Sequence, residues 1–145
     1  MMSTKKKKYK ADIILFIGTI ALCVLGLVII RANQEPGLTA RIMGDGELVT
    51  TIPLGDDGLY ILECDTNGYT VRDISDKELD DLKKDGFEYN DTSDYYVNIL
   101  SVDASGIEVL DANCRDKICV EHSIIYNTGE TIICLPHKLV IEVAE

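Results

Sequence analysis

The apolar positions divide the chain into one continuous apolar segment and a longer region of short runs. Residues 13–30 contain no charged side chain, and the basic run Lys5-Lys6-Lys7-Lys8-Tyr9-Lys10 precedes them. A membrane-spanning helix needs roughly 20 apolar residues to cross a hydrocarbon core of about 30 Å. The pattern therefore predicts one transmembrane helix over residues 11–31, preceded by a basic tail at residues 1–10.

The flanks of this segment predict its orientation and its fate. The lysine run precedes it and only Arg31 follows it closely, so the positive-inside rule places the N-terminus in the cytoplasm and the remainder outside. A cleaved signal peptide has an apolar core of about 7–15 residues and small residues at its cleavage site, whereas β-branched residues and an arginine stand here. We expect an uncleaved signal-anchor in the cell membrane, followed by a short tether at residues 32–37.

The rest of the chain alternates short apolar runs with turn sequences. Gly44-Asp45-Gly46 and Asp65-Thr66-Asn67-Gly68 are typical of tight hairpin turns, because Asn-Gly and Asp-Gly favour positive φ. These runs predict an exterior all-β domain over residues 38–145, a small barrel or sandwich of antiparallel strands. The predicted strands are residues 38–43, 47–52, 59–64, 69–74, 95–102, 107–111, 123–126, 131–135 and 138–143.

One short helix interrupts the predicted strands. Ser75 and Glu78 match the capping-box pattern that opens many helices. We therefore predict a helix over Asp76–Asp85 and a polar surface loop over residues 87–94. Together they form an insertion at residues 75–94.

Charge narrows the possible functions of the exterior domain. Residues 32–145 hold 24 acidic and 8 basic side chains, a difference of −16. Such a surface repels phosphate backbones. The chain also lacks a nucleophile elbow, a phosphate-binding loop and a His-Glu-x-x-His motif. We therefore expect no nucleic-acid binding and no enzymatic activity.

Four of the five cysteines follow the apolar segment: Cys64, Cys114, Cys119 and Cys134. Outside the cytoplasm such thiols can form disulfides. Four cysteines allow three complete pairings, and the sequence does not choose among them. One bridge together with a free thiol in the C-terminal trio is also open.

The two histidines follow two of these cysteines at equal spacing. Cys119-Val-Glu-His122 and Cys134-Leu-Pro-His137 are separated by eleven residues. Two Cys and two His are the ligands of many zinc sites and of Rieske-type iron–sulfur centres. However, Rieske centres use a Cys-x-His unit, no zinc-knuckle glycines frame these units, and Cys114 would be left over. We expect no metal or cofactor. The alternative function is a thiol-redox or metal-binding electron-transfer module that uses Cys114, Cys119 and Cys134.

Eight positions in the C-terminal segment form a specific pattern: Cys114, Asp116, Lys117, Cys119, Gly129, Cys134, Pro136 and Lys138, followed by an Ile/Val-rich strand. This pattern resembles the NusG domain II family, many members of which are small stand-alone proteins with an N-terminal membrane segment. The resemblance implies an all-β, barrel-like exterior domain of unknown biochemical function. It does not imply a role in transcription, because the chain has no room for the N-terminal domain and KOW module of NusG.

Local interpretation of this pattern gives three structural expectations. Residues 116–119 form a tight turn that buries Ile118, and Pro136 marks a strand edge or bulge because it lacks an N–H group. We hypothesise a Cys114–Cys134 bridge ahead of Cys114–Cys119. The sequence as a whole predicts a non-catalytic accessory or binding domain that is anchored in the membrane and has an envelope protein as its partner.

Overall fold

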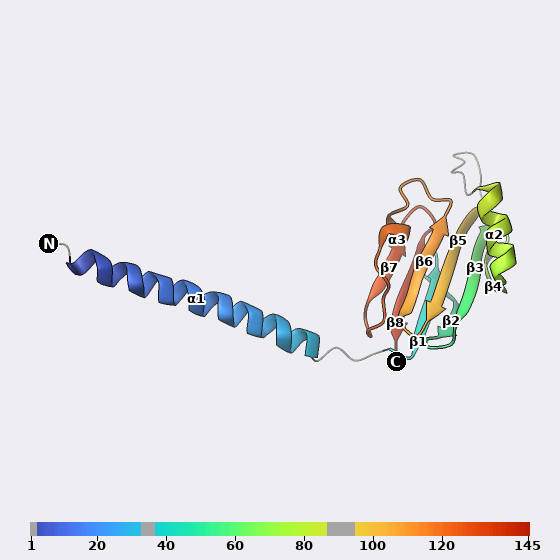
Figure 1. Ribbon diagram of the computed structural model, residues 1–145. Coiled ribbons are helices and arrows are strands. Elements are labelled where there is room, and N and C mark those ends of the chain that lie inside the picture. The colour runs from blue at the N-terminus through green and yellow to red at the C-terminus, as the bar shows by residue number, and fades with distance from the viewer. Residues whose placement is uncertain (1–2, 33–36, 87–94) are drawn as a thin grey trace. The chain divides into compact units, whose positions relative to one another are not determined.

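The computed structural model describes residues 3–32, 37–86 and 95–145 (Figure 1). The chain divides into two units, Met1–Gln34 and Glu35–Glu145. Most of the predicted tether and the predicted loop at residues 87–94 lie outside the described residues.

The first unit is helix α1 (Ser3–Ala32). Its segment Asp12–Ala32 is, within the described part of the chain, the one helix long and apolar enough to cross a membrane, with a mean hydropathy of 3.1 and no burial. The hydroxyl of Thr19 donates to the backbone carbonyls of Leu15 and Phe16, at 3.1 and 2.8 Å, which satisfies a polar group in an apolar helix. The predicted helix is therefore confirmed as a candidate membrane-spanning segment.

The second unit consists mainly of two antiparallel four-stranded sheets. One sheet has the order β2-β1-β8-β7 and the other β4-β3-β5-β6. The strands are β1 (Thr39–Gly44), β2 (Glu47–Pro53), β3 (Gly58–Asp65), β4 (Gly68–Ile74), β5 (Tyr96–Asp103), β6 (Gly106–Ala112), β7 (Thr131–Cys134) and β8 (Leu139–Ala144). This arrangement confirms the predicted all-β fold.

The main core lies between the two sheets. Fully buried side chains from both sheets meet there, including Ile42 of β1, Leu62 of β3 and Ile141 of β8. Successive strand residues point to opposite faces, so Ile61, the neighbour of Leu62, belongs to a second apolar cluster together with Leu79. The sheet containing β3 is therefore covered on both faces.

Helix α2 (Asp76–Asp85) covers this second face (Figure 1). It begins as predicted, because the Ser75 hydroxyl accepts a hydrogen bond from the Glu78 backbone N–H at 3.3 Å. It ends at Gly86, whose φ of 76° is easily adopted only by a residue without a side chain.

The prediction of a strand at residues 123–126 is wrong. Only Ile125 pairs there, in an isolated bridge with Ile107. The Glu130 carboxylate instead accepts from the backbone N–H groups of Tyr126 and Asn127, at 2.9 and 3.0 Å. A side chain therefore satisfies N–H groups that a strand ladder would have used.

Two local expectations near the cysteines are also wrong. Ile118 is 67% exposed and opens a short helix, α3 (Ile118–Glu121), whose buried residue is Cys119. Pro136 lies in a turn between β7 and β8, closed by a 3.1 Å hydrogen bond from Lys138 N–H to Leu135 C=O. Its fixed φ suits the second position of such a turn, so it marks neither a strand edge nor a bulge.

Candidate functional site

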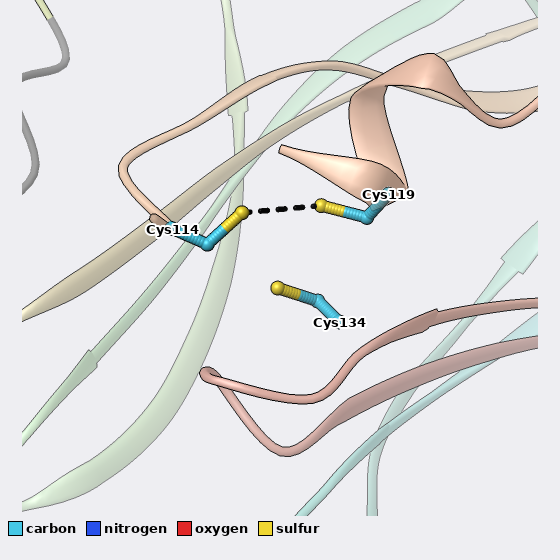
Figure 2. Close-up of side chains that lie close together, drawn as sticks. All are labelled: Cys114, Cys119 and Cys134. Atoms are coloured by element: carbon cyan, nitrogen blue, oxygen red, sulfur yellow. Dashed lines mark hydrogen bonds between the residues drawn. The ribbon is translucent and has the colours of Figure 1, made fainter. Parts of the chain in front are cut away.

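Three cysteine side chains meet at one end of the β domain (Figure 2). Cys114 follows β6, Cys119 lies on α3 and Cys134 ends β7, and each is 2% exposed. Their Sγ atoms all lie within 4.8 Å of one another, and those of Cys114 and Cys119 are 3.6 Å apart. We call these three residues the cysteine cluster.

Strand β5 fixes the segment that carries Cys114. The Asn113 side chain accepts from the Val97 backbone N–H at 2.8 Å and donates to the Tyr95 carbonyl at 3.1 Å. Lys117, the residue immediately before α3, then adopts a left-handed conformation, with φ of 48°. The chain thereby reverses within a few residues and brings Cys119 next to Cys114.

Each sulfur of the cluster has an N–H hydrogen-bond donor beside it. The backbone N–H of Lys117 donates to Cys114, and the backbone N–H of His137 donates to Cys134. In both cases the donor lies three residues after the cysteine. The third sulfur, that of Cys119, is 3.7 Å from the Asn98 side-chain nitrogen.

A buried hydrogen-bond network lies next to the cysteine cluster. Asn98 and His137 are 0% and 1% exposed, and His137 Nδ1 lies 2.6 Å from Asn98 Oδ1. Since the Asn98 amide nitrogen faces Cys119, its oxygen is the acceptor and Nδ1 carries the proton. The His137 ring also stacks on Tyr96, with ring centroids 4.8 Å apart. His137 is thereby held in one orientation.

The three thiols differ in their acidity. A hydrogen bond from the Cys119 thiol, with a further one from the backbone N–H of His137, lowers the pKa of Cys134 despite its burial. The same hydrogen bond to Cys134, together with burial, raises the pKa of Cys119. Burial raises the pKa of Cys114. Cys119 and Cys134 therefore titrate as a coupled pair, joined by a hydrogen bond between their sulfurs.

The cysteine cluster borders a cavity of about 90 Å³. The other residues that line it are Asp116, Lys117, Ile118, Ile133, Leu135 and Pro136. Several of these side chains are exposed, notably Leu135 at 81% and Ile118 at 67%. We call Ile118, Ile133 and Leu135 the apolar rim.

The residues predicted as metal candidates are only partly brought together. Cys119 and Cys134 lie side by side, and His137 is a hydrogen-bond donor to Cys134. His122 is exposed, and its Nδ1 lies 2.8 Å from the Ser123 carbonyl. The third sulfur of the cluster is that of Cys114, which the predicted set of two cysteines and two histidines left out.

The disulfide hypotheses remain predictions. All five cysteines, each among the described residues, are free thiols. Cys64 lies apart from the cluster in β3, with its Sγ 3.9 Å from the Asp65 carbonyl. Asn98 and Tyr96 were missed from the sequence, although a buried asparagine within the apolar run of β5 was a signal.

The remaining pattern residues shape the backbone around the site. Lys117 and Lys138 both have φ of 48°, and their ammonium groups lie 2.9 Å from Asp111 and 3.2 Å from Asp45. Gly129 has φ of 86°, and its N–H donates to the Val143 carbonyl at 2.8 Å. These positions therefore hold turns rather than ligands.

Fold and site define a small two-sheet β domain with a buried cysteine cluster, preceded by a candidate membrane-spanning helix. The model of the NusG domain II family matches residues 13–145. The chain therefore belongs to the NusG domain II family. No curated protein matches the chain.

Three solved structures are similar to the chain. A DUF1312 family protein from Ruminococcus gnavus has 25% identity and a TM-score of 0.47, covering 74% of this chain and 97% of that one. The Lin0431 protein from Listeria innocua has 23% identity and a TM-score of 0.47, covering 74% and 94%. A DUF1312 family protein from Enterococcus faecalis has 26% identity and a TM-score of 0.46, covering 72% and 93%.

Proposed function

We propose that the protein is a non-catalytic accessory domain, anchored in the cell membrane, that binds an envelope protein outside the cytoplasm. The observation that carries this proposal is that no residue of the 21-residue segment Asp12–Ala32 is buried. Apolar surface of this extent is unfavourable in water and favourable in lipid. The β domain has its own core and needs no contribution from this helix.

Charge supports the orientation. The lysine run before the apolar segment favours a cytoplasmic N-terminus by the positive-inside rule. The acidic domain after it is repelled by an anionic membrane surface, which favours a position away from the lipid.

The apolar rim supports a protein partner. Ile118, Ile133 and Leu135 are 67%, 48% and 81% exposed, on a domain whose other surface is strongly acidic. Exposed apolar side chains gathered at one place mark many interaction sites. The partner that fits is an envelope protein with an apolar contact surface surrounded by basic side chains.

Protease treatment of intact cells tests the anchor and its orientation. The full chain carries an epitope tag at its C-terminus, and mass spectrometry of the membrane fraction determines whether Asp12–Ala32 is retained. We expect an uncleaved membrane protein whose tagged domain is degraded from outside. A tag that survives in intact cells but not in lysed cells, or a released product lacking the segment, contradicts the proposal.

Site-specific photo-crosslinking tests the partner. A photoreactive residue replaces Leu135 on the apolar rim, and the matched control replaces Leu48 of β2, which is 56% exposed. We expect one membrane or exported protein to be captured from position 135 and not from position 48. Equal capture from both positions counts against a specific partner at the rim.

A second candidate function is favoured by the cysteine cluster. Three buried sulfurs within 4.8 Å of one another can act as a thiol-redox pair with a third thiol, or as a soft-metal ligand set. Acid quenching of cells followed by alkylation and mass spectrometry tests whether any two of these thiols are joined in a disulfide in the cell. Complete alkylation of all three without prior reduction counts against the thiol-redox form, and titration with a soft metal ion tests the ligand set.

A further inference from the structure

We propose that Cys114, Cys119 and Cys134 form a binding site for a single Cu(I) ion, coordinated by their three sulfurs. This proposal rests on the second candidate function and makes it specific. It is independent of the membrane orientation, because none of the three ligands belongs to α1.

The spacing of the sulfurs fits one ion. With metal–sulfur bonds of about 2.3 Å, the sulfurs of a trigonal site lie about 4.0 Å apart. In the structure one pair is at 3.6 Å and all pairs are within 4.8 Å. Binding therefore needs only small side-chain adjustments, and the site is largely formed before the ion arrives.

The N–H groups around the cluster suit bound thiolates. Lys117 and His137 donate backbone N–H groups to the sulfurs three residues before them, and Asn98 faces Cys119. Hydrogen bonds of this kind spread the negative charge of metal-bound sulfur and orient the ligands. Cys64 lies apart from this group in β3, and its sulfur is 3.9 Å from the Asp65 carbonyl.

The number and type of donors select the ion. Thiolates are soft ligands that favour Cu(I), zinc and iron–sulfur clusters, and structural zinc almost always takes four ligands. Among the described residues, no fourth Cys, His, Asp or Glu ligand atom joins the group. No ring nitrogen of His137 joins the three sulfurs, and its Nδ1 is already hydrogen-bonded to Asn98. Three soft donors beside a small, partly apolar cavity match a three-coordinate monovalent ion.

The binding step is a simple exchange. Each thiol that becomes a ligand releases its proton as its sulfur bonds to copper, so three protons leave when all three bind. No electron is transferred, and the product carries two negative charges. The surrounding N–H groups offset this charge, and the apolar rim lies at the cavity through which the ion would pass.

Competition for Cu(I) tests the site. The full chain, in detergent micelles under anaerobic reducing conditions, is titrated with Cu(I) against a chromophoric Cu(I) chelator. We expect one Cu(I) per chain, and X-ray absorption with three sulfur neighbours. Cys114→Ser, Cys119→Ser and Cys134→Ser should each weaken binding by more than about 100-fold, beyond the loss typical of removing a residue that only hydrogen-bonds to a ligand. The matched control Cys64→Ser should leave affinity unchanged.

Two further measurements keep the result interpretable. Tyrosine fluorescence in urea checks that each variant is folded, and Cys114→Ser is the decisive one because Cys114 lies in a loop. Failure to hold Cu(I) against the chelator, equal weakening by Cys64→Ser, or preferential retention of four-coordinate zinc overturns the proposal. Protease treatment of cells is unaffected by any of these results, so failure of the copper site leaves the proposed anchoring separately testable.

Discussion

The two Cys-x-x-His units have identical spacing, but their histidines lie in different environments. In Cys134-Leu-Pro-His137 the histidine is 1% exposed and lies within a polar network. In Cys119-Val-Glu-His122 the histidine is exposed, and its ring Nδ1 lies 2.8 Å from the adjacent Ser123 carbonyl. The same pattern of residue types therefore gives one constrained histidine and one surface histidine.

Local backbone structure explains the difference. Cys134 ends a strand and is followed by a turn, so the chain folds back and returns His137 toward the sulfur. Cys119 lies inside α3, and His122 is the residue at which that helix ends, with φ and ψ of −68° and 139°. An extended residue after a helix continues away from it. Spacing alone therefore does not define a ligand set.

The structural counterpart of the His137 turn is Cys114-Arg-Asp-Lys117. In both segments an N–H three residues onward donates to the cysteine sulfur, and a lysine with φ of 48° completes the reversal. The feature that recurs around the cysteine cluster is therefore a backbone N–H donor rather than a histidine.

Replacing each histidine by itself should give the largest difference in stability between the two units. His137→Ala removes a buried ring and leaves Asn98 Oδ1 without its donor, so we expect the free energy of unfolding to fall by about 2–4 kcal/mol. His122→Ala, the matched control, should change it by less than about 0.5 kcal/mol. Urea unfolding followed by tyrosine fluorescence measures both, since the chain has seven tyrosines and no tryptophan. Equal losses would falsify the distinction between the two units.

The next largest effect should come from Asn98. Asn98→Ala leaves the His137 Nδ1–H and the Cys119 sulfur without their partner, and we expect a loss of about 1–3 kcal/mol. Asn67→Ala removes an exposed asparagine from a turn and should cost less than about 1 kcal/mol. If Asn98→Ala proves as mild as Asn67→Ala, the buried network does not fix the His137 turn.

Much of the fold could be predicted because its determinants are local. The capping residues Ser75 and Glu78 and the Asp45-Gly46 turn, with φ of 50° and 85°, act within a few residues of the chain. Apolar runs likewise predicted most strands. These signals depend on the residue types themselves, so the sequence carries them directly.

The three cysteines of the cluster were named together from the sequence, but their geometry could not be predicted, because they lie in the loop after β6, in α3 and at the end of β7. The metal-site hypothesis, which depended on spacing, favoured the histidines and left out Cys114. Ile118 was expected inside because it is apolar, but in a single helical turn only one face is buried, and Cys119 occupies it. The false strand at residues 123–126 arose because the Glu130 carboxylate replaces strand hydrogen bonds, which no apolar pattern reveals.

Replacing Tyr69 should have a smaller and pH-dependent effect on stability, because its hydroxyl is hydrogen-bonded to the turn that carries His137. The Tyr69 hydroxyl donates to the His137 carbonyl at 2.9 Å, and burial, with the nearby Cys64, raises the pKa of Tyr69 to about 12. A raised pKa stabilises the folded state below the unfolded value of about 10, and this contribution is lost as the pH rises from 10 to 12. Tyr69→Phe should lower the free energy of unfolding by about 1 kcal/mol at pH 8. Above pH 10, the stability of this variant should fall less steeply with pH than that of the unchanged protein. Parallel pH curves for the two proteins would show that this hydroxyl is not the titrating group.

The smallest effect on stability is expected at the apolar rim. Ile118 is 67% exposed whereas its neighbour Cys119 is 2% exposed, so Ile118→Ser should change the free energy of unfolding by less than about 0.5 kcal/mol. The same change should reduce crosslinking from position 135 if the rim contacts a partner, because it removes apolar area from that contact. Urea unfolding and crosslinking yield, measured on one preparation, separate the two effects. A large loss of stability would mean that Ile118 packs inside after all, and unchanged crosslinking would remove it from the partner surface.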